Sequence, residues 1–270
     1  MLDSLERIAQ KTVLTRYPGH ATEVALEGQA YGGVVAVGGD GTLFEILKGF
    51  DRANQRIAII PAGRGNSLAH DLGLMHGGAF AGRMNWERVR TIDLLEVCVT
   101  TADGVESTHV SASTIAVGYP SAVVRRARKM AWMGKISYAA ATAFVSPKHF
   151  NARIQYEGGR PREARLSGFI ANNTRYLANF LAFHQGNCSD GRFEIMEMNA
   201  ARIKQTAHNL SALSGSRAYE PYPSLQAKRA QVWLETPREL MIDGEILPGV
   251  VAMKIRILPS ALACNGWKPQ

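Results

Sequence analysis

Two short apolar runs, each followed at once by a glycine-rich loop, constrain the fold of this chain most. Residues 33–37 read Gly-Val-Val-Ala-Val and lead into Gly-Gly-Asp-Gly-Thr at residues 38–42. Residues 56–60 read Arg-Ile-Ala-Ile-Ile and lead into a second glycine-containing loop at residues 61–66. A continuous apolar run of this kind is typical of a strand that is covered on both faces. The two runs therefore predict neighbouring strands of a parallel sheet, with both loops at the edge where such sheets bind ligands.

Helix-like segments alternate with these two runs. We predict helices over residues 2–11, 21–30, 42–50 and 67–74, and the clearest of them place apolar side chains at helical spacing. Strands and helices in this alternation indicate a parallel sheet with helices on both sides.

After about residue 92 the pattern changes to short strand-like segments separated by polar or Gly/Pro turns. Strands are predicted over residues 94–100, 108–117, 153–156, 166–172, 193–197, 231–235 and 251–258. A helical stretch is predicted at residues 121–144, and the polar residues 201–230 predict a long loop. We therefore expect an α/β nucleotide-binding domain with a parallel sheet at residues 1–94, followed by a mainly antiparallel β-sandwich domain at residues 95–256.

Composition narrows the functional classes only a little. The chain has 270 residues and a net charge of +8, which favours anionic partners such as nucleotide phosphates, nucleic acid or anionic lipid without choosing among them. No run approaches the length of an apolar membrane span, and the first residues do not read as a secretory signal, so we expect a cytoplasmic protein. Cys98, Cys188 and Cys264 are far apart and form no zinc pattern.

The loop at residues 38–42 has the composition of a phosphate cradle. Glycines allow a tight turn and close approach of the backbone, and the N–H groups that open the following helix can hold an anion. The loop is neither a Walker A sequence nor a dinucleotide fingerprint. Alone it could equally be a turn without a ligand. The second glycine loop at the same sheet edge favours a bound nucleotide.

Six motifs spread over most of the chain together resemble the lipid kinase family that includes bacterial diacylglycerol kinases and sphingosine kinases. They are Thr15 with Gly19, Ala21 and Glu23; Gly38 to Glu45; Pro61 to Ala69; Gly134 to Tyr138; Asp190-Gly191; and Asp243-Gly244-Glu245. Each motif is weak by itself, whereas their order and spacing together are specific.

The resemblance implies a two-domain fold like that of the NAD and diacylglycerol kinases, and transfer of the γ-phosphate of ATP to a lipid hydroxyl. It implies that the end of the chain, residues 257–270, returns to the first domain. The expected ATP-binding residues are Thr15, Gly38, Gly39, Asp40, Gly41, Thr42, Glu45, Gly63, Arg64 and Asn66. Asp190 would hold Mg²⁺ with the carbonyls of Asn187 and Arg192. Glu245 would accept the proton, with Asp243 beside it and Asp40 as a third catalytic carboxylate.

Elementary chemistry supports the same acidic residues. Phosphoryl transfer depends on positioning and charge neutralisation, on Mg²⁺ with oxygen ligands, and on a carboxylate near the attacking hydroxyl. Asp40, Asp190, Asp243 and Glu245 can supply such groups. An Asp-Gly pair between apolar runs also predicts a hairpin turn, so Asp190 and Asp243 carry the functional interpretation only as part of the set.

Two departures from the family keep other hypotheses open. The family's Asn-Pro-x-Ser-Gly segment does not occur in this sequence, and Phe44 stands where the family often has asparagine. A non-catalytic nucleotide-binding relative is therefore a second hypothesis. An NAD-kinase-like enzyme is a third, although that family's Asn-Glu pair does not occur either.

The segment at residues 121–133 mixes four Lys or Arg residues with apolar ones. It predicts either a packed helix with a solvated basic face or peripheral contact with an anionic inner membrane surface. Basic and aromatic residues are not interleaved as in nucleic-acid-binding motifs, so we expect no nucleic-acid partner. The sequence leaves the lipid and the oligomeric state open.

Overall fold

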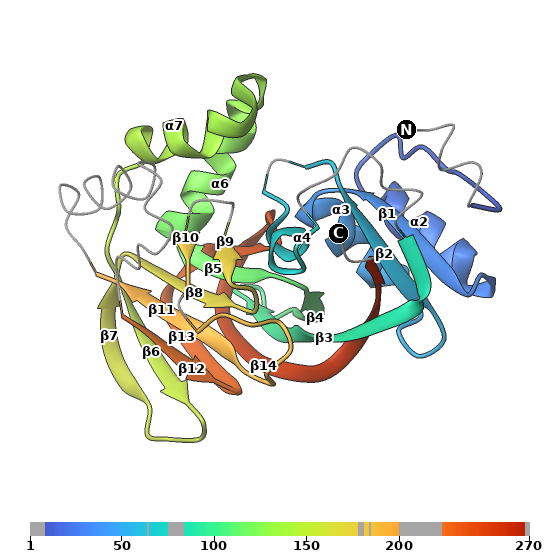
Figure 1. Ribbon diagram of the computed structural model, residues 1–270. Coiled ribbons are helices and arrows are strands. Elements are labelled where there is room, and N and C mark those ends of the chain that lie inside the picture. The colour runs from blue at the N-terminus through green and yellow to red at the C-terminus, as the bar shows by residue number, and fades with distance from the viewer. Residues whose placement is uncertain are drawn as a thin grey trace.

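The computed structural model describes residues 9–63, 65–74, 84–177, 181–183, 185–199 and 223–267. Its first part alternates helices and strands, as predicted (Figure 1). The elements are α2 (His20–Glu27), the 3₁₀ helix η1 (Gly28–Ala30), β1 (Gly33–Gly38), α3 (Asp40–Gly49), β2 (Arg56–Pro61) and α4 (Ser67–Asp71). β1 and β2 pair in parallel, with Val35 opposite Ala58. Both strands therefore end at the same sheet edge, where α3 and α4 begin.

The second part is dominated by strands. They are β3 (Met84–Thr101), β4 (Glu106–Ser111), β5 (Thr114–Gly118), β6 (Phe150–Tyr156), β7 (Arg162–Leu166), β8 (Gly168–Asn172), β9 (Tyr176–Leu177), β10 (Leu181–Ala182), β11 (Phe193–Met198), β12 (Ser224–Ala227), β13 (Arg229–Ile242) and β14 (Glu245–Trp267). Apart from the β1–β2 pair and one β2–β14 bridge, the strand pairings among the described residues are antiparallel. The fold class predicted from the sequence is confirmed.

β14 joins the two parts of the molecule. It pairs with β13 and β3 in antiparallel fashion, and at Cys264 it bridges Ile57 of β2 in parallel. Leu262 and Cys264 pack in one core cluster with Leu43, Ile57 and other apolar residues of the first part. The C-terminal part of β14 thus lies beside the parallel strands. Because one sheet runs through the whole molecule and β3 crosses residues 94 and 95, the predicted domain division remains a proposal.

Several predicted boundaries differ from the structure. Residues 2–8 of the first predicted helix lie outside the described residues, and residues 9–11 are not helical. Helix α4 ends at Asp71 rather than at residue 74, with Gly73 at a left-handed φ of 72° just beyond. The predicted strand at residues 108–117 is two strands, β4 and β5. The strand at residues 166–172 is broken at residue 167.

The predicted helical stretch at residues 121–144 also divides. It forms α6 (Tyr119–Lys129), the 3₁₀ segment η2 (Ala131–Ile136) and α7 (Ser137–Phe144), and Gly134 (φ 59°, ψ −132°) makes the kink. Most of the predicted loop at residues 201–230 lies outside the described residues, but residues 224–227 form β12 and β13 starts at Arg229. Among the helices that the structure describes, none has the length and apolar character to cross a membrane.

Candidate nucleotide and phosphoryl-transfer site

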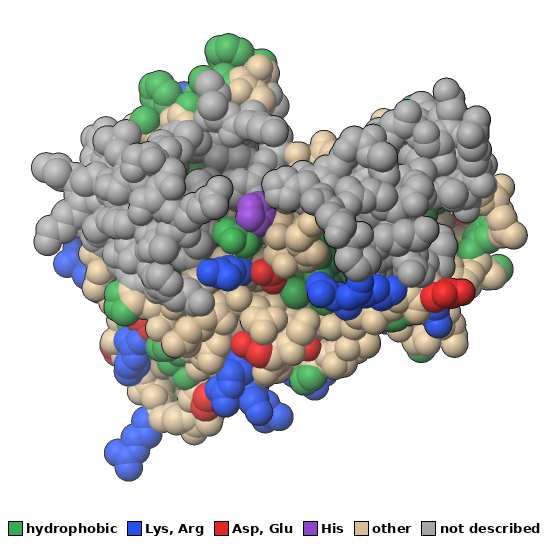
Figure 2. Space-filling model, viewed as in Figure 1, with side chains coloured by type: hydrophobic (Ala, Val, Ile, Leu, Met, Phe, Trp, Pro, Cys, Tyr) green, Lys and Arg blue, Asp and Glu red, His purple; other side chains and the backbone are tan. Residues whose placement is uncertain are grey.

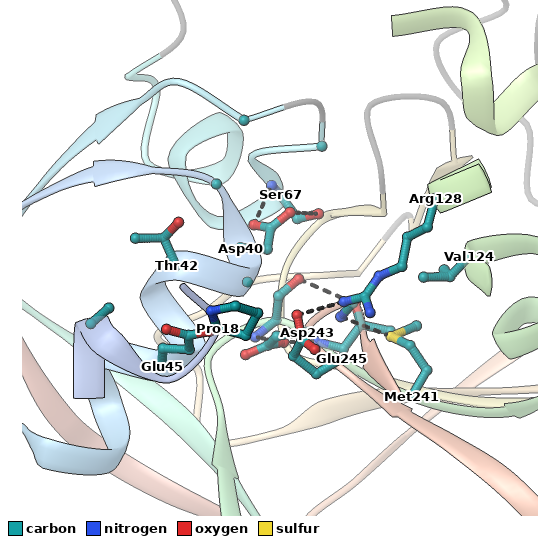
Figure 3. A pocket seen from close by; sticks show the side chains of 18 of the residues that line it. Pro18, Asp40, Thr42, Glu45, Ser67, Val124, Arg128, Met241, Asp243 and Glu245 are labelled. Atoms are coloured by element: carbon teal, nitrogen blue, oxygen red, sulfur yellow. Dashed lines mark hydrogen bonds and ion pairs between the residues drawn. The ribbon is translucent and has the colours of Figure 1, made fainter. Parts of the chain in front are cut away.

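A cavity of about 530 Å³ lies where the glycine loops of the first part meet β13, β14 and α6 (Figure 3). The first part contributes Thr15, the turn from Gly39 to Thr42, Glu45 and Gly63. The second part contributes Ser113, Thr114, Arg128, Met241 and the turn from Asp243 to Glu245. Segments more than two hundred residues apart in the sequence therefore share one cavity.

The two glycine loops touch each other at the cavity wall. A Cβ atom on Gly63 would lie 2.4 Å from the Cα of Gly39, so neither position has room for a side chain. Asn66 holds the second loop, because its amide group donates to the carbonyl of Gly63 at 2.7 Å and accepts from the N–H of Gly63 at 2.9 Å. Gly38 is also constrained, since a Cβ there would lie 2.5 Å from the hydroxyl of Thr42. Close packing against the other loop's backbone at Gly39 and Gly63, and against the Thr42 side chain at Gly38, thus explains these glycines without any ligand.

Asp40, the first residue of α3, links the two loops electrostatically. Its carboxylate accepts a hydrogen bond from the N–H of Ser67 at 2.8 Å and one from the Ser67 hydroxyl at 3.4 Å, at the start of α4. Burial, together with the negative charge of Asp243, raises the pKa of Asp40 to about 6. At neutral pH Asp40 is therefore mainly a carboxylate that faces the cavity, where it would repel a phosphate unless a cation lies between them.

Asp243 and Gly244 form the turn between β13 and β14, at φ angles of 47° and 92°. The carboxylate of Asp243 is buried and accepts four hydrogen bonds, all from the β4–β5 connection and its ends. The donors are the Ser111 hydroxyl (2.7 Å) and the N–H groups of Ala112 (2.7 Å), Ser113 (3.0 Å) and Thr114 (2.8 Å). Burial raises the pKa of Asp243, against these hydrogen bonds. The side chain thus braces the turn and the connection against each other.

Glu245, the first residue of β14, has its side chain in the cavity. One carboxylate oxygen forms an ion pair with Arg128 of α6 at 2.5 Å, and both side chains are about two-fifths exposed (Figure 3). A Cβ on Gly41 would lie 3.4 Å from the same Glu245 oxygen. The glycine loop and the Glu245 carboxylate therefore face each other directly across the cavity.

Most of the predicted nucleotide and catalytic residues come together in this cavity. Thr15, Gly39, Asp40, Gly41, Thr42, Glu45, Gly63, Asp243 and Glu245 line it. Gly38 and Asn66 support the loops from behind, and Arg64 lies outside the described residues. Their binding and catalytic roles stay predictions.

Arg128 is one of several cavity residues that the sequence did not mark as part of the site; Arg16, Ser113 and Met241 are others. The sequence marked Arg128 only as one of several cations on a basic helix. Its spacing of four residues from Val124, which also lines the cavity, places both on one face of α6. That spacing could have linked Arg128 to Val124, but nothing in the sequence indicated which face of α6 meets the cavity.

The residues predicted to hold Mg²⁺ lie elsewhere. Asn187, Asp190 and Arg192 are in the loop before β11 and do not line the cavity. One oxygen of Asp190 accepts from the N–H of Arg192 at 3.0 Å and the other from the amide of Gln226 at 3.3 Å. Gln226 also donates to Glu194, whose burial raises its pKa to about 7.

Within the described ranges, no group of three His, Cys, Asp or Glu side chains is placed to hold a metal ion. Glu194 has a buried oxygen without a hydrogen-bond partner among the described residues. The predicted Mg²⁺ ligands are the Asp190 carboxylate and two backbone carbonyls, which is not a group of this kind, so that assignment stays a prediction.

Comparisons with known proteins give the family context of this geometry. Residues 3–97 match the model of the diacylglycerol kinase catalytic domain, and this range contains both glycine loops. The match covers residues 3–97 of the 270, so the similarity to this family lies in the first part of the chain. The matched range ends in β3 and does not include Asp190, Asp243 or Glu245.

Solved structures agree on the fold. A protein from Bacillus anthracis str. Sterne, assigned as a diacylglycerol kinase, superimposes with a TM-score of 0.73 at 20% identity, covering 98% of this chain and 89% of that chain. A further diacylglycerol kinase structure from the same organism gives a TM-score of 0.71 at 20% identity, covering 94% and 84%. At this identity the likeness shows the fold alone. A search of curated proteins found no match.

Proposed function

We propose that the protein is an ATP-dependent kinase that transfers the γ-phosphate to a lipid hydroxyl of the diacylglycerol or sphingoid type. The observation that carries the proposal is the approach of the glycine loop to a carboxylate across one cavity. Gly41 lies next to Glu245, so a phosphate held by the loop would have a candidate general base beside it. The product would be a phosphorylated lipid. We expect the reaction to take place at the cytoplasmic surface of a membrane.

In this proposal, each part of the cavity has its own role in the reaction. The N–H groups at the start of α3 and the hydroxyl of Thr42 bind the phosphates of ATP. Glu245 takes the proton from the lipid hydroxyl as the γ-phosphate is transferred. Asp243 acts as a positioning residue, because its carboxylate is already occupied by four hydrogen bonds and its turn holds Glu245 in place.

Charge balance requires cations in this cavity. The phosphates of ATP would meet the carboxylates of Asp40 and Glu245, and Mg²⁺ that arrives with ATP would screen that repulsion. Arg128 supplies a further positive charge at the cavity wall. Its ion pair with Glu245 supports a role for Arg128 beside the transferred phosphate.

The test is transfer of labelled γ-phosphate from Mg·ATP to a panel of lipids in mixed micelles. We expect label in a diacylglycerol or a sphingoid base with the wild-type protein. Glu245→Gln should lower the rate by about 100-fold or more, the scale of general-base catalysis. The variant keeps the size of the side chain, so the fold should be preserved.

Glu239→Gln is the matched control. Glu239 forms a similar ion pair with another arginine of α6, Arg125, at 2.6 Å, but does not line the cavity. It should leave the rate unchanged. Equal rates for Glu245→Gln and the wild-type protein would refute the assigned base. ATP binding without transfer to any lipid would favour a non-catalytic relative instead.

A further inference from the structure

Helix α6 leads from the cavity to an exposed aromatic and basic surface. Val124 and Arg128 line the cavity, and Trp132, only four residues further along, has 84% of its surface exposed. Phe144, at the end of α7, is 65% exposed. α6 and α7 stand above the sheet, and hydrophobic side chains gather at the top of the molecule over α7 (Figures 1 and 2). Exposed apolar side chains that gather in a patch, unlike ones scattered singly, mark contact surfaces.

The same region carries a strong positive charge. Residues 119–150 contain six Lys or Arg residues and no Asp or Glu. Arg125 and Arg128 pair with Glu239 and Glu245 of the hairpin formed by β13 and β14. Arg126, Lys129 and Lys148 are exposed, and none forms an ion pair with a described carboxylate. The guanidinium of Arg126 lies 5.5 Å from the ring centre of Phe144, so the cationic and aromatic parts are contiguous.

We propose that this α6–α7 surface, formed by Arg126, Lys129, Trp132, Phe144 and Lys148, docks on an anionic lipid bilayer. Trp and Phe side chains partition into the interfacial region of a bilayer, while flanking Lys and Arg side chains bind anionic head groups. A second copy of the chain is disfavoured as occupant, because two surfaces of the same charge repel each other.

Docking in this way would bring the cavity to the membrane. Arg126 and Lys129 of this surface flank Arg128 in the last turn of α6, so a lipid beneath the surface would lie close to Glu245 and the glycine loop. This step rests on the proposed lipid kinase function. The docking itself does not rest on that function, because it depends only on the charge and the exposed aromatic side chains of α6, η2 and α7.

The experiment is sedimentation of the full chain with vesicles of phosphatidylcholine alone or of phosphatidylcholine with phosphatidylglycerol, without ATP. We expect preferential binding to the anionic vesicles. Arg126→Gln with Lys129→Gln should reduce partitioning about 25-fold, given the usual contribution of each basic residue near an anionic surface. Trp132→Ser with Phe144→Ser should reduce it about tenfold or more.

Control variants carry changes of the same kind far from this surface. Arg160→Gln with Lys254→Gln removes the same charge, with Arg160 in the turn between β6 and β7 at the opposite end of Figure 1. Val105→Ser removes another exposed apolar side chain, in the turn between β3 and β4. These variants should bind like the wild-type protein. Far-UV circular dichroism and thermal unfolding show whether each variant is folded.

Trp132→Phe provides a readout that does not depend on loss of binding. It should bind vesicles as the wild-type protein does, yet lose most of the blue shift in tryptophan emission that vesicles induce. Wild-type protein that stays in solution, or that binds equally well with either surface pair replaced, would overturn the proposal. So would self-association or binding to single-stranded nucleic acid that the same substitutions abolish.

A short-chain, water-soluble diacylglycerol separates this proposal from the proposed function. Turnover of that substrate without vesicle binding would leave the kinase standing and remove the docking surface. Vesicle binding that requires Trp132 and Phe144, without phosphate transfer to any lipid, would support the docking surface and refute the proposed kinase activity.

Discussion

Replacing Asp243 with alanine should destabilise the protein strongly, because this carboxylate supports the connection between β4 and β5. Asp243 is 3% exposed, and the three backbone N–H groups that it accepts from, those of Ala112, Ser113 and Thr114, are buried as well. Alanine at position 243 leaves these donors without a partner and without room for several waters.

The size of the effect follows from the number of lost partners. Each buried donor left unsatisfied costs about 1–3 kcal/mol, and three of them set an upper range of about 3–9 kcal/mol. Removal of the buried charge offsets part of this, since burial disfavours the ionised form of Asp243, as its raised pKa shows. Some water will also enter from the cavity side. We therefore expect a loss of about 3–5 kcal/mol in the free energy of unfolding.

Urea unfolding followed by far-UV circular dichroism measures this loss, with Asp103→Ala as the control. Asp103 accepts a side-chain hydrogen bond from Thr101 in the exposed turn between β3 and β4, so its removal should cost less than about 1 kcal/mol. A similarly small loss for Asp243→Ala would refute the argument. The β4–β5 connection would then hold its own shape, and Asp243 would be available for chemistry.

Three further predictions concern the cavity. Gly63→Ala forces the two glycine loops apart and should cost about 1–3 kcal/mol in urea unfolding, whereas Gly32→Ala, which has open space around it, should not. Asp40 has a pKa of about 6 in the folded protein and near 4 when unfolded, so wild-type stability should fall as the pH rises from about 4 to 6. Asp40→Asn should show a smaller fall in pH-dependent urea unfolding, because the raised pKa values of Asp243 and Glu194 still contribute. Arg128→Met should weaken ATP binding about tenfold or more by isothermal titration calorimetry, while its stability changes by less than about 1 kcal/mol. Arg125→Met, which removes a similar ion pair outside the cavity, should bind ATP normally; equal affinities for both variants would contradict a phosphate contact by Arg128.

The sequence predicted the first half of the fold well because the signals there are local. Each apolar run and the glycines that end it lie within ten residues, and β1, α3 and β2 form where these signals place them. The boundaries that failed depend on tertiary contacts instead. β4 and β5, for example, divide where the carboxylate of Asp243, about 130 residues away, binds the connecting backbone.

The same distinction applies to the site. The glycine loops were predictable because their chemistry is contained in a few consecutive residues. The ion pair between Arg128 and Glu245 joins residues 117 positions apart, and no spacing in the sequence indicates it. Likewise, the sequence offered Asp40 as a ligand-binding residue, whereas its hydrogen bonds to Ser67 also give it a structural role at the start of α4.

The two Asp-Gly pairs show why a dipeptide alone cannot separate a turn from a functional site. Asp243-Gly244 is the hairpin turn between β13 and β14, and it also lines the cavity. The turn places Glu245 opposite the glycine loop, and the proposed catalytic role rests on that position. Asp190-Gly191 is also a turn, yet it lies outside the cavity, with its carboxylate bonded to Arg192 and Gln226. What distinguishes the two pairs is the course of β14. That strand begins at the cavity and ends beside β2, and so ties the first turn to the parallel sheet edge.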